Sequence, residues 1–420
     1  MALGSRLRGS THGPYPDRPT VTCSDHTFRN ASVTDPCGVS RIGRVMADVT
    51  DKLPTPAAKR ALLHKLALPW WTILFPALGL VAIAISLYSF GTAGTVLATA
   101  VLIGAVLAAV HHAEVVAHRV GEPFGTLVLA VAVTVIEVSL IVSLMLSDAG
   151  DASALARDTV FAAIMIILNG IVGLCLMAGG LRHGEQRFTL RGVSAALAVL
   201  TAMAVLSLVL PNYVSSAPGP TYAPTQLVFV AVVSLFLYLM FVLVQTVRHR
   251  EYFLPDEDLP EDAHAERPSN PTTYASLALL LIALVGVVML AKGLSATVET
   301  AILNAGLPLA IVGVVIAALV LAPESLAAYR AAKRNRLQTS LNLALGSALA
   351  TIGLTIPSVA IVSLLLDLPL ALGIGPKSIT LLILSLFTIT LSLGTGRTTI
   401  LGGAVHLVIF AAYLFITVVP

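Results

Sequence analysis

Long apolar stretches dominate the chain from Leu68 onward. Each is at least 17 residues long, which suffices for an α-helix to cross the roughly 30 Å of hydrocarbon in a bilayer. The pattern predicts an all-α, polytopic membrane protein with about eleven transmembrane helices. The predicted spans are 68–89, 92–112, 123–147, 158–180, 192–211, 224–247, 273–292, 304–332, 338–365, 377–393 and 400–419.

Composition supports this pattern. Of the 420 residues, 57% are hydrophobic and 11% are charged, about half the charged share of a soluble domain. A net charge of +3 without an aromatic-flanked basic stripe gives no reason to expect nucleic acid as a partner. Cys23, Cys37 and Cys175 form no pair at metal or redox spacing. The expected partners are the lipid bilayer and small ions, and the oligomeric state stays open.

The segment before the first span is polar. Residues 1–65 are predicted to be a cytoplasmic and mostly disordered tail without the apolar core of a signal peptide. A short basic segment begins at Met46 and precedes the first span. Residues 1–45 are therefore expected to be dispensable.

Lysine and arginine predict the orientation, because cytoplasmic loops hold the excess of these residues. With the N-terminus inside, the inner connections carry twelve of them and the outer connections carry three, namely Arg157, Lys292 and Lys377. We expect a multi-pass protein of the cell's inner (plasma) membrane, with a cytoplasmic N-terminus and an outer C-terminus.

The longest inner connection, residues 248–272, is acidic. It contains seven carboxylates, five of them close together: Asp256, Glu257, Asp258, Glu261 and Asp262. The segment is either a solvated linker or a weak regulatory cation site, since clustered carboxylates attract hard cations. We expect it to tune apparent affinity rather than to supply the transport site.

Two glutamates lie inside predicted spans, where a charge costs about 2.5 to 3.5 kcal/mol or more. Glu137 precedes Asp148, and Glu324 precedes Asn335, by eleven residues each. At 1.5 Å per residue, both lie about 16 Å from a helix end, near the bilayer midplane. One such residue could be a neutral, hydrogen-bonded carboxyl, but two at matched depth favour a functional pair.

The two glutamate helices are the third and eighth spans, so they run in opposite directions. This predicts an orphan first helix (66–90), a five-helix repeat (91–247), the acidic linker (248–272) and a second, inverted five-helix repeat (273–420). Inverted repeats with a site at their interface are typical of secondary transporters. Two carboxylates in a low-dielectric site resist ionising together, so protons and a cation should compete for them.

Other oxygens are expected near this pair. Pro323 lacks a backbone donor and should kink its helix and free a carbonyl next to Glu324. The span after each glutamate is rich in small and polar residues, and we select Asn169 and Ser347 as oxygen ligands.

Two segments resemble a known family. Residues 121–141 (GEPFGTLVLAVAVTVIEVSLI) and 323–357 (PESLAAYRAAKRNRLQTSLNLALGSALATIGLTIP) are similar to the two alpha-repeats of the calcium/cation antiporter superfamily, specifically the ChaA-type calcium/proton antiporters. The resemblance implies exchange of cytosolic calcium or sodium for protons, without a cofactor. It also implies that Glu137 and Glu324 are the repeat glutamates that hold the metal cation, and that Gly346 and Ser347 are the second-repeat glycine and serine.

The chain departs from the vacuolar-type members of this superfamily, which place Gly-Asn before each glutamate. Here Val133 and Thr134 precede Glu137, and Val320 and Leu321 precede Glu324. Fewer amide oxygens near the site make transport of sodium or potassium easier to defend. Thr134 is also a candidate ligand.

A group of titratable residues permits a different class of function. It consists of His111, Glu114 and His118, with His112 beside them. Their spacing along a helix end allows a plain interfacial face, a pH sensor built on the three histidines, or the metal ligands of an intramembrane enzyme. The spacing is not HExxH, and we expect a transporter rather than an enzyme.

Overall fold

The computed structural model describes residues 68–121, 124–146, 152–254 and 268–419. All described residues belong to one compact unit. The predicted tail, Met46 and the five clustered linker acids lie outside the described residues, so the structure does not bear on them.

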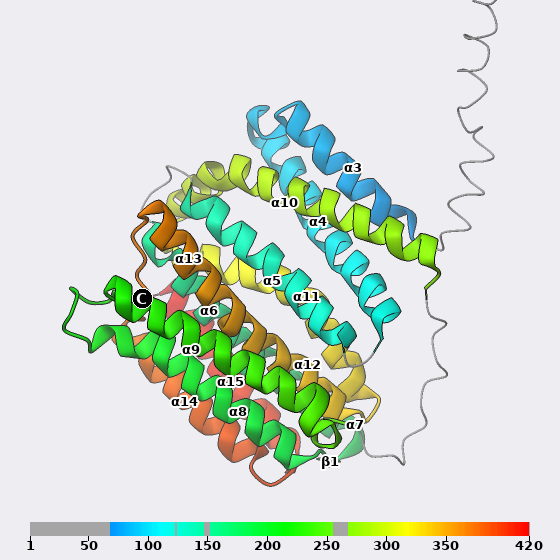
Figure 1. The fold of residues 1–420 in the computed structure, drawn as a ribbon, viewed down its shortest axis with the longest axis vertical. Coiled ribbons are helices and arrows are strands. Elements are labelled where there is room, and N and C mark those ends of the chain that lie inside the picture. Colours follow the sequence, from blue (N-terminus) through cyan, green and yellow to red (C-terminus); the bar gives the residue numbers. More distant parts are fainter. Residues whose placement is uncertain (1–67, 122–123, 147–151, 255–267, 420) are drawn as a thin grey trace, which may run out of the picture. The chain divides into compact units, whose positions relative to one another are not determined.

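Helices make up nearly all of the described chain, as expected (Figure 1). In these residues, nine helices are long and apolar enough to cross a membrane, and two shorter apolar helices, Trp70–Ala84 and Val128–Ser143, bring the set to eleven. The fold class predicted from hydropathy is therefore confirmed. The spans are α3 (Trp70–Ala84), α4 (Gly91–Val120), α5 (Phe124–Met145), α6–η3–α7 (Leu155–Met165, Ile166–Ile171, Val172–His183), α8–η4 (Leu190–Ala204, Val205–Val209), α9–η6 (Pro224–Leu243, Val244–Arg248), α10 (Asn270–Asn304), α11 (Ala310–Lys333), α12–η8–α13 (Leu337–Ala350, Thr351–Thr355, Ile356–Leu366), α14 (Pro376–Leu393) and α15 (Ile400–Val418).

Short elements fill the connections. They are the 3₁₀ turns η1 (Leu87–Ser89), η2 (Ala152–Ala154), η5 (Leu210–Asn212) and η7 (Arg250–Tyr252), and the strands β1 (Gln186–Arg187) and β2 (Arg397–Thr398).

Two helices extend well beyond the apolar spans predicted from sequence. Helix α4 continues to Val120, because nothing in residues 113–120 breaks a helix, and it ends at Gly121, whose φ of +78° suits glycine. Helix α10 runs for 35 residues, past Lys292 to Asn304. The longer α4 places His111, Glu114 and His118 within a helix.

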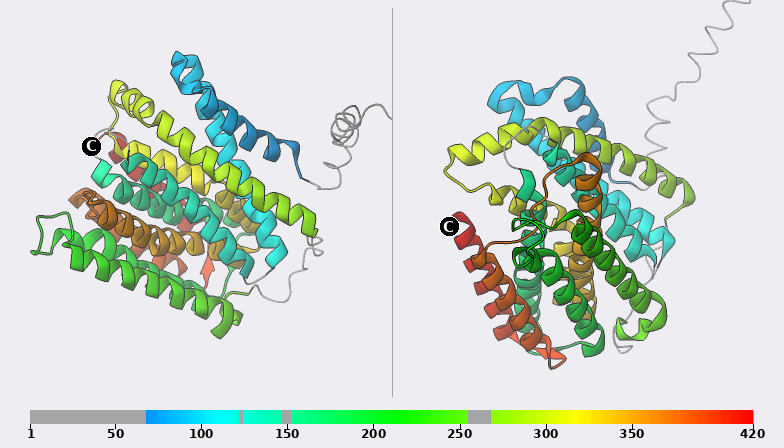
Figure 2. Two further views of the ribbon diagram at one scale, coloured as in Figure 1. Left: turned by 45° about the horizontal axis from the view of Figure 1, so that its top comes forward. Right: turned by 60° about the vertical axis from the view of Figure 1, so that its left-hand side comes forward.

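The buried apolar side chains form separate clusters. The largest joins α6–α9 with α12–α15, a second joins α4, α5 and α10, and a third joins α3, α4 and α10. Helices α3, α4 and α10 lie side by side in both further views (Figure 2). The glutamate helices α5 and α11 contribute to both larger clusters, so they lie at the boundary between the two.

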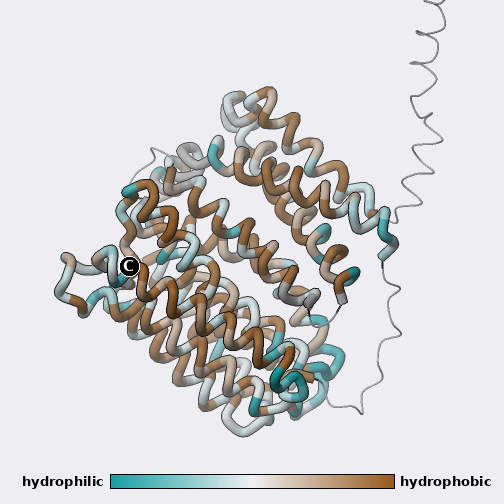
Figure 3. The backbone as a smooth tube through the Cα atoms, in the orientation of Figure 1, coloured by the Kyte–Doolittle hydropathy of each residue, from teal (hydrophilic) through white to brown (hydrophobic). Residues whose placement is uncertain are grey.

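Polar residues gather where the helices end, and apolar residues cover their lengths (Figure 3). We call the end that carries Arg119, Arg187, Arg250, Arg334 and Arg397 the basic face, and the other end the opposite face. At the basic face β1 pairs antiparallel with β2, with Gln186 opposite Thr398. At the opposite face Thr221 and Ala371 form an isolated antiparallel bridge.

Candidate functional site

The two membrane glutamates are brought together at the boundary between the clusters. Glu137 on α5 is 3% exposed, and its Oε2 accepts a hydrogen bond of 3.2 Å from the Thr351 hydroxyl. Its other oxygen, Oε1, is buried without a partner. Glu324 on α11 also has a buried, unpartnered oxygen, Oε2. The helices that carry the two glutamates, α5 and α11, pack against each other.

A buried carboxylate oxygen without a donor is unfavourable, because nearly all buried polar atoms in proteins have a partner. A proton on the oxygen, or a cation beside it, would supply what is missing. The arrangement therefore fits a site that alternates between protons and a cation.

A cavity leads to one of the two glutamates. It has a volume of about 330 Å³ and is lined by Glu324, Gly346 and Ser347, together with Asn342, Gln245 and Arg250. Arg250, at the start of η7, places one end of this cavity at the basic face. Glu137 is absent from its lining. Glu324 is thus the carboxylate that an ion in the cavity would meet.

Helix α12 supplies the polar lining next to Glu324. Ser347 lies beside the Glu324 carboxylate, and a Cβ added at Gly346 would meet nothing within 4 Å. Gly346 and Ser347, the predicted second-repeat pair, thus both line the cavity together with Glu324. Thr134, on α5, is 5% exposed and precedes Glu137 by three residues, which puts it on the same helix face.

Each span that follows a glutamate helix contains a π-helical segment. These are η3 (Ile166–Ile171), between α6 and α7, and η8 (Thr351–Thr355), between α12 and α13. π-helical insertions are rare and often mark functional sites. Their matched positions in the two halves were not predicted from the sequence.

Segment η8 supplies two hydroxyls that the sequence reasoning did not select. Thr351 bonds Glu137, while Thr355 faces the same carboxylate outside hydrogen-bond geometry, and its hydroxyl has no partner. The signal was present in the spacing, because Thr351 follows Ser347 by four residues and so lies on the same face of a helix.

Segment η3 directs its polar side chain elsewhere. The Asn169 amide nitrogen donates to Ser385 at 2.8 Å, and its oxygen bonds His406 Nδ1 at 3.1 Å. The other ring nitrogen of His406 bonds the Ser392 hydroxyl at 2.8 Å. In this conformation Asn169 is engaged with α14 and α15, and the structure gives it no bond to either glutamate.

The histidine group lies along the last turns of α4. The His112 ring is buried, and its Nε2 bonds the Thr72 carbonyl of α3 at 2.9 Å. His111 Nδ1 is 4.0 Å from the Glu114 carboxylate, and His118 is exposed. Among the described residues, no three His, Cys, Asp or Glu side chains come together as metal ligands.

Comparison with known proteins gives matches over most of the chain. A family model described as "Sodium/calcium exchanger protein" matches residues 90–247 and 275–419. The protein y4hA of Sinorhizobium fredii is 51% identical over 358 residues, which cover 84% of this chain and 97% of the relative.

The sodium-potassium/proton antiporter ChaA of Escherichia coli is 35% identical over 355 residues, which cover 82% of this chain and 94% of that protein. A solved structure of the Ca²⁺/H⁺ antiporter protein YfkE matches the fold with a TM-score of 0.63 at 15% identity, over 83% of this chain and 99% of the other.

Proposed function

The chain belongs to the family of sodium/calcium exchanger proteins, and from this we infer that it is an antiporter, which moves cations one way across a membrane and protons the other. It is a multi-pass membrane transporter and not an enzyme, so the metal-dependent alternative at His111, Glu114 and His118 is unsupported. Such exchange is driven by ion gradients and requires no cofactor.

The observation that carries this proposal is the buried pair Glu137 and Glu324, each with an oxygen that lacks a partner. Two carboxylates buried in one low-dielectric region resist being charged at the same time. A bound cation compensates them, and so do protons, but the two cannot do so in full at the same time. Competition at one site, exposed to one side of the membrane at a time, couples the two fluxes.

Calcium, sodium and potassium are the proposed cations. The E. coli relative is named for sodium and potassium, and YfkE for calcium. In this chain, threonine hydroxyls lie beside Glu137 and the Ser347 hydroxyl lies beside Glu324, which supports weak, exchangeable binding. We assign Glu137, Glu324, Ser347, Thr134 and the open position at Gly346 to the cation site. Asn169 joins them only in a state in which its amide has left Ser385 and His406.

The proposed topology has the basic face in the cytoplasm of a cell whose inner membrane the chain spans, with the N-terminus inside and the C-terminus outside. The excess of arginine at that face supports this orientation. The cavity then gives Glu324 access to cytoplasmic ions. The family model matches two separate segments, residues 90–247 and 275–419, which supports two repeats joined by the acidic linker.

Two regulatory roles belong to the same proposal. Asp256, Glu257, Asp258, Glu261 and Asp262 raise the local cation concentration, since exposed carboxylates bind cations weakly. Neutralising all five should shift the half-saturating cation concentration and leave maximal flux largely intact. His111, His112 and His118 are proposed to respond to cytoplasmic pH.

Cation-dependent proton flux in reconstituted vesicles tests the function, with calcium, sodium and potassium added in turn. Glu137→Gln or Glu324→Gln should abolish the flux and leave the protein folded, because the amide resembles a protonated carboxyl in shape. Glu→Asp should retain partial activity with an altered ion preference, because the carboxylate retreats by one methylene. Near-normal flux in a Gln variant would remove that residue from the site, and an enzyme would show no such flux at all.

A further inference from the structure

We propose that the Tyr238 hydroxyl is a further oxygen ligand of the transported cation, at the inner end of the cavity that reaches Glu324. The inference rests on the proposed exchange function. It adds a residue from α9, a span that has so far supplied no ligand.

The lining of the cavity follows two helices inward from the basic face. On α12, which begins at that face, the lining residues run from Thr339 to Ser347. On α9 and η6, which lead to that face, they run back from Thr246 to Tyr238. Ser347 and Tyr238 are therefore the innermost lining residues of their helices.

The distance along the helices places Glu324 at the same end of the cavity. Tyr238 precedes Arg248, at the end of η6, by ten residues, and Glu324 precedes Arg334 by ten. At 1.5 Å per residue, both lie about 15 Å inward from the helix ends at the basic face. Since both also line one cavity, the phenol and the carboxylate share its inner end.

Tyr238 also contacts the segment that holds the second glutamate. A Cβ added at Gly353 of η8 would lie 2.4 Å from Tyr238 Cβ, so α9 passes directly against η8 at this point. Two residues earlier in η8, the Thr351 hydroxyl donates to Glu137 at 3.2 Å. Tyr238 therefore lies between the cavity that reaches one glutamate and the segment that binds the other.

The Tyr238 hydroxyl is not used elsewhere in the protein. The residue is 3% exposed, yet its hydroxyl forms no hydrogen bond with any residue that the structure describes. Tyr222, which is also buried, donates its hydroxyl to the Leu206 carbonyl at 2.6 Å, as a buried tyrosine usually does. A buried tyrosine that lines a cavity and keeps its oxygen free can offer that oxygen to an ion in the cavity.

The chemistry of the inner end suits a hard cation. Calcium, sodium and potassium prefer oxygen ligands, and calcium takes about six to eight of them. The Glu324 carboxylate supplies negative charge, while Ser347 and Tyr238 supply neutral oxygens. The positive charge of Arg250 lines the end at the basic face, twelve residues further along the chain than Tyr238. The phenol stays neutral throughout and takes no part in proton exchange.

Tyr238→Phe tests this assignment, because it removes one oxygen and keeps the ring. In reconstituted vesicles, the variant should raise the half-saturating concentration of the cation that the wild type exchanges fastest. We expect an increase of about fivefold, the scale of one lost neutral bond, with the maximal rate of cation-dependent proton flux largely kept. The melting temperature of the purified protein without cation should stay unchanged, since no bond within the protein is lost.

Tyr222→Phe is the matched control, because it removes the same atom from a hydroxyl that bonds the backbone. It should lower the melting temperature and leave the half-saturating concentration unchanged. Thermal unfolding in detergent over a series of cation concentrations gives a second readout, since a ligand that binds the folded state raises its stability. In Tyr238→Phe, the cation concentration at half of this stabilisation should increase by the same factor as in the flux assay.

An unchanged half-saturating concentration in Tyr238→Phe would overturn the proposal, and so would a loss of maximal rate alone. A cation-free melting temperature that falls as in Tyr222→Phe would assign the hydroxyl to the packed core and would overturn it as well. Failure of the proposed function would appear in the wild type, as the absence of cation-dependent proton flux. Failure of this inference would appear in the variant alone.

Discussion

Glu137 and Glu324 match in depth but differ in their surroundings. Glu137 is held by Thr351 and lies away from the cavity, whereas Glu324 lines it beside Ser347. On the proposed function, an ion from the basic face would meet Glu324 first and reach Glu137 second. We therefore expect two different tasks: Glu324 exchanges its occupant, and Glu137 completes the site.

Thr351 tests the second of these tasks. Thr351→Val keeps the shape and removes the hydroxyl that donates to Glu137, a bond to a charged group worth about 1.5 to 3 kcal/mol. We expect the half-saturating cation concentration to rise about tenfold or more, because 1.4 kcal/mol corresponds to a factor of ten.

The measurement for Thr351 is initial flux as a function of cation concentration in vesicles. Thr351→Ser retains the hydroxyl and should stay within about twofold of wild type. An unchanged half-saturation for the valine variant would mean that the 3.2 Å contact has no part in binding.

Gly346 and Gly353 lie seven residues apart in one span and offer a matched pair. An added Cβ at Gly346 would meet open space, but at Gly353 it would lie 2.4 Å from Tyr238 Cβ. Gly346→Ala should keep the melting temperature of the purified protein and reduce flux, because the methyl group enters the cavity beside Glu324.

Gly353→Ala should instead lower stability by about 1 to 3 kcal/mol, the usual cost of overpacking. Thermal unfolding in detergent compares the two variants directly. A lower melting temperature for Gly346→Ala than for Gly353→Ala would contradict the placement of both residues.

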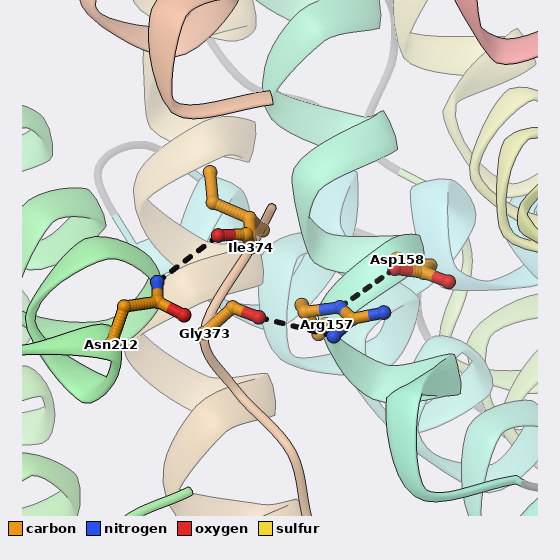
Figure 4. Close-up of polar contacts among 5 residues, drawn as sticks. All are labelled: Arg157, Asp158, Asn212, Gly373 and Ile374. Atoms are coloured by element: carbon orange, nitrogen blue, oxygen red, sulfur yellow. Dashed lines mark hydrogen bonds and ion pairs between the residues drawn. The ribbon is translucent and has the colours of Figure 1, made fainter. Parts of the chain in front are cut away.

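At the scale of elements, each face has an extended connection between two spans, and polar contacts with other parts of the chain hold it in place. At the basic face, Gln186 of β1 donates to the Ala332 carbonyl at 3.0 Å, and the Glu185 carboxylate pairs with Arg397 at 3.3 Å. At the opposite face, Arg157 donates to the Gly373 carbonyl, and Asn212 to the Ile374 carbonyl, at 3.0 Å each (Figure 4). Inverted repeats would relate these two connections, which join the fourth span to the fifth and the ninth to the tenth.

Arg157 is the anchor of the second connection. It also pairs with Asp158 at 2.8 Å (Figure 4). Arg157→Ala should destabilise the protein by about 1 to 3 kcal/mol, because the buried Gly373 carbonyl loses its donor. The melting temperature should fall by several degrees, whereas Lys377→Ala, an exposed cation at the same face, should leave it unchanged. Equal melting temperatures for the two variants would show that the Arg157 bond contributes nothing.

Hydropathy was sufficient to predict the eleven spans, because each must cover the apolar thickness of a membrane whatever it packs against. The same reasoning located Glu137 and Glu324, since a carboxylate inside such a span stands out. It could not show that Asn169 turns toward His406, because that depends on α14 and α15, more than 200 residues later. The π-helical segments and the length of α4 were not predicted from the sequence for a similar reason. The local sequence allows several backbone conformations, and tertiary contacts decide between them.

At the scale of the whole molecule, the site lies where two apolar clusters meet. In the described conformation the cavity beside Glu324 has one end at the basic face. On the proposed function, deprotonated carboxylates bind the cation, and a lower pH favours the protonated form. Lowering the pH on the cation side should therefore raise the half-saturating cation concentration, by up to about tenfold per pH unit for each competing proton, and leave the maximal rate unchanged.

Initial rates over a series of pH values and cation concentrations in inside-out vesicles check this prediction. A maximal rate that falls while half-saturation stays constant would show that protons inhibit elsewhere than at the cation site. The Glu137→Asp variant serves as a control, because its shorter carboxylate should change the affinity at every pH and keep the competitive pattern.

The connections between spans are held in similar ways at the two faces, and this similarity bears on the direction of transport. β1 with β2 at one face, and Thr221 with Ala371 at the other, fasten the ends of the larger cluster in the same manner. Because the described framework is held alike at both ends, we expect exchange to run in either direction. The steeper of the two ion gradients should then set the direction, and loss of the proton gradient should let the cation move down its own gradient through this protein.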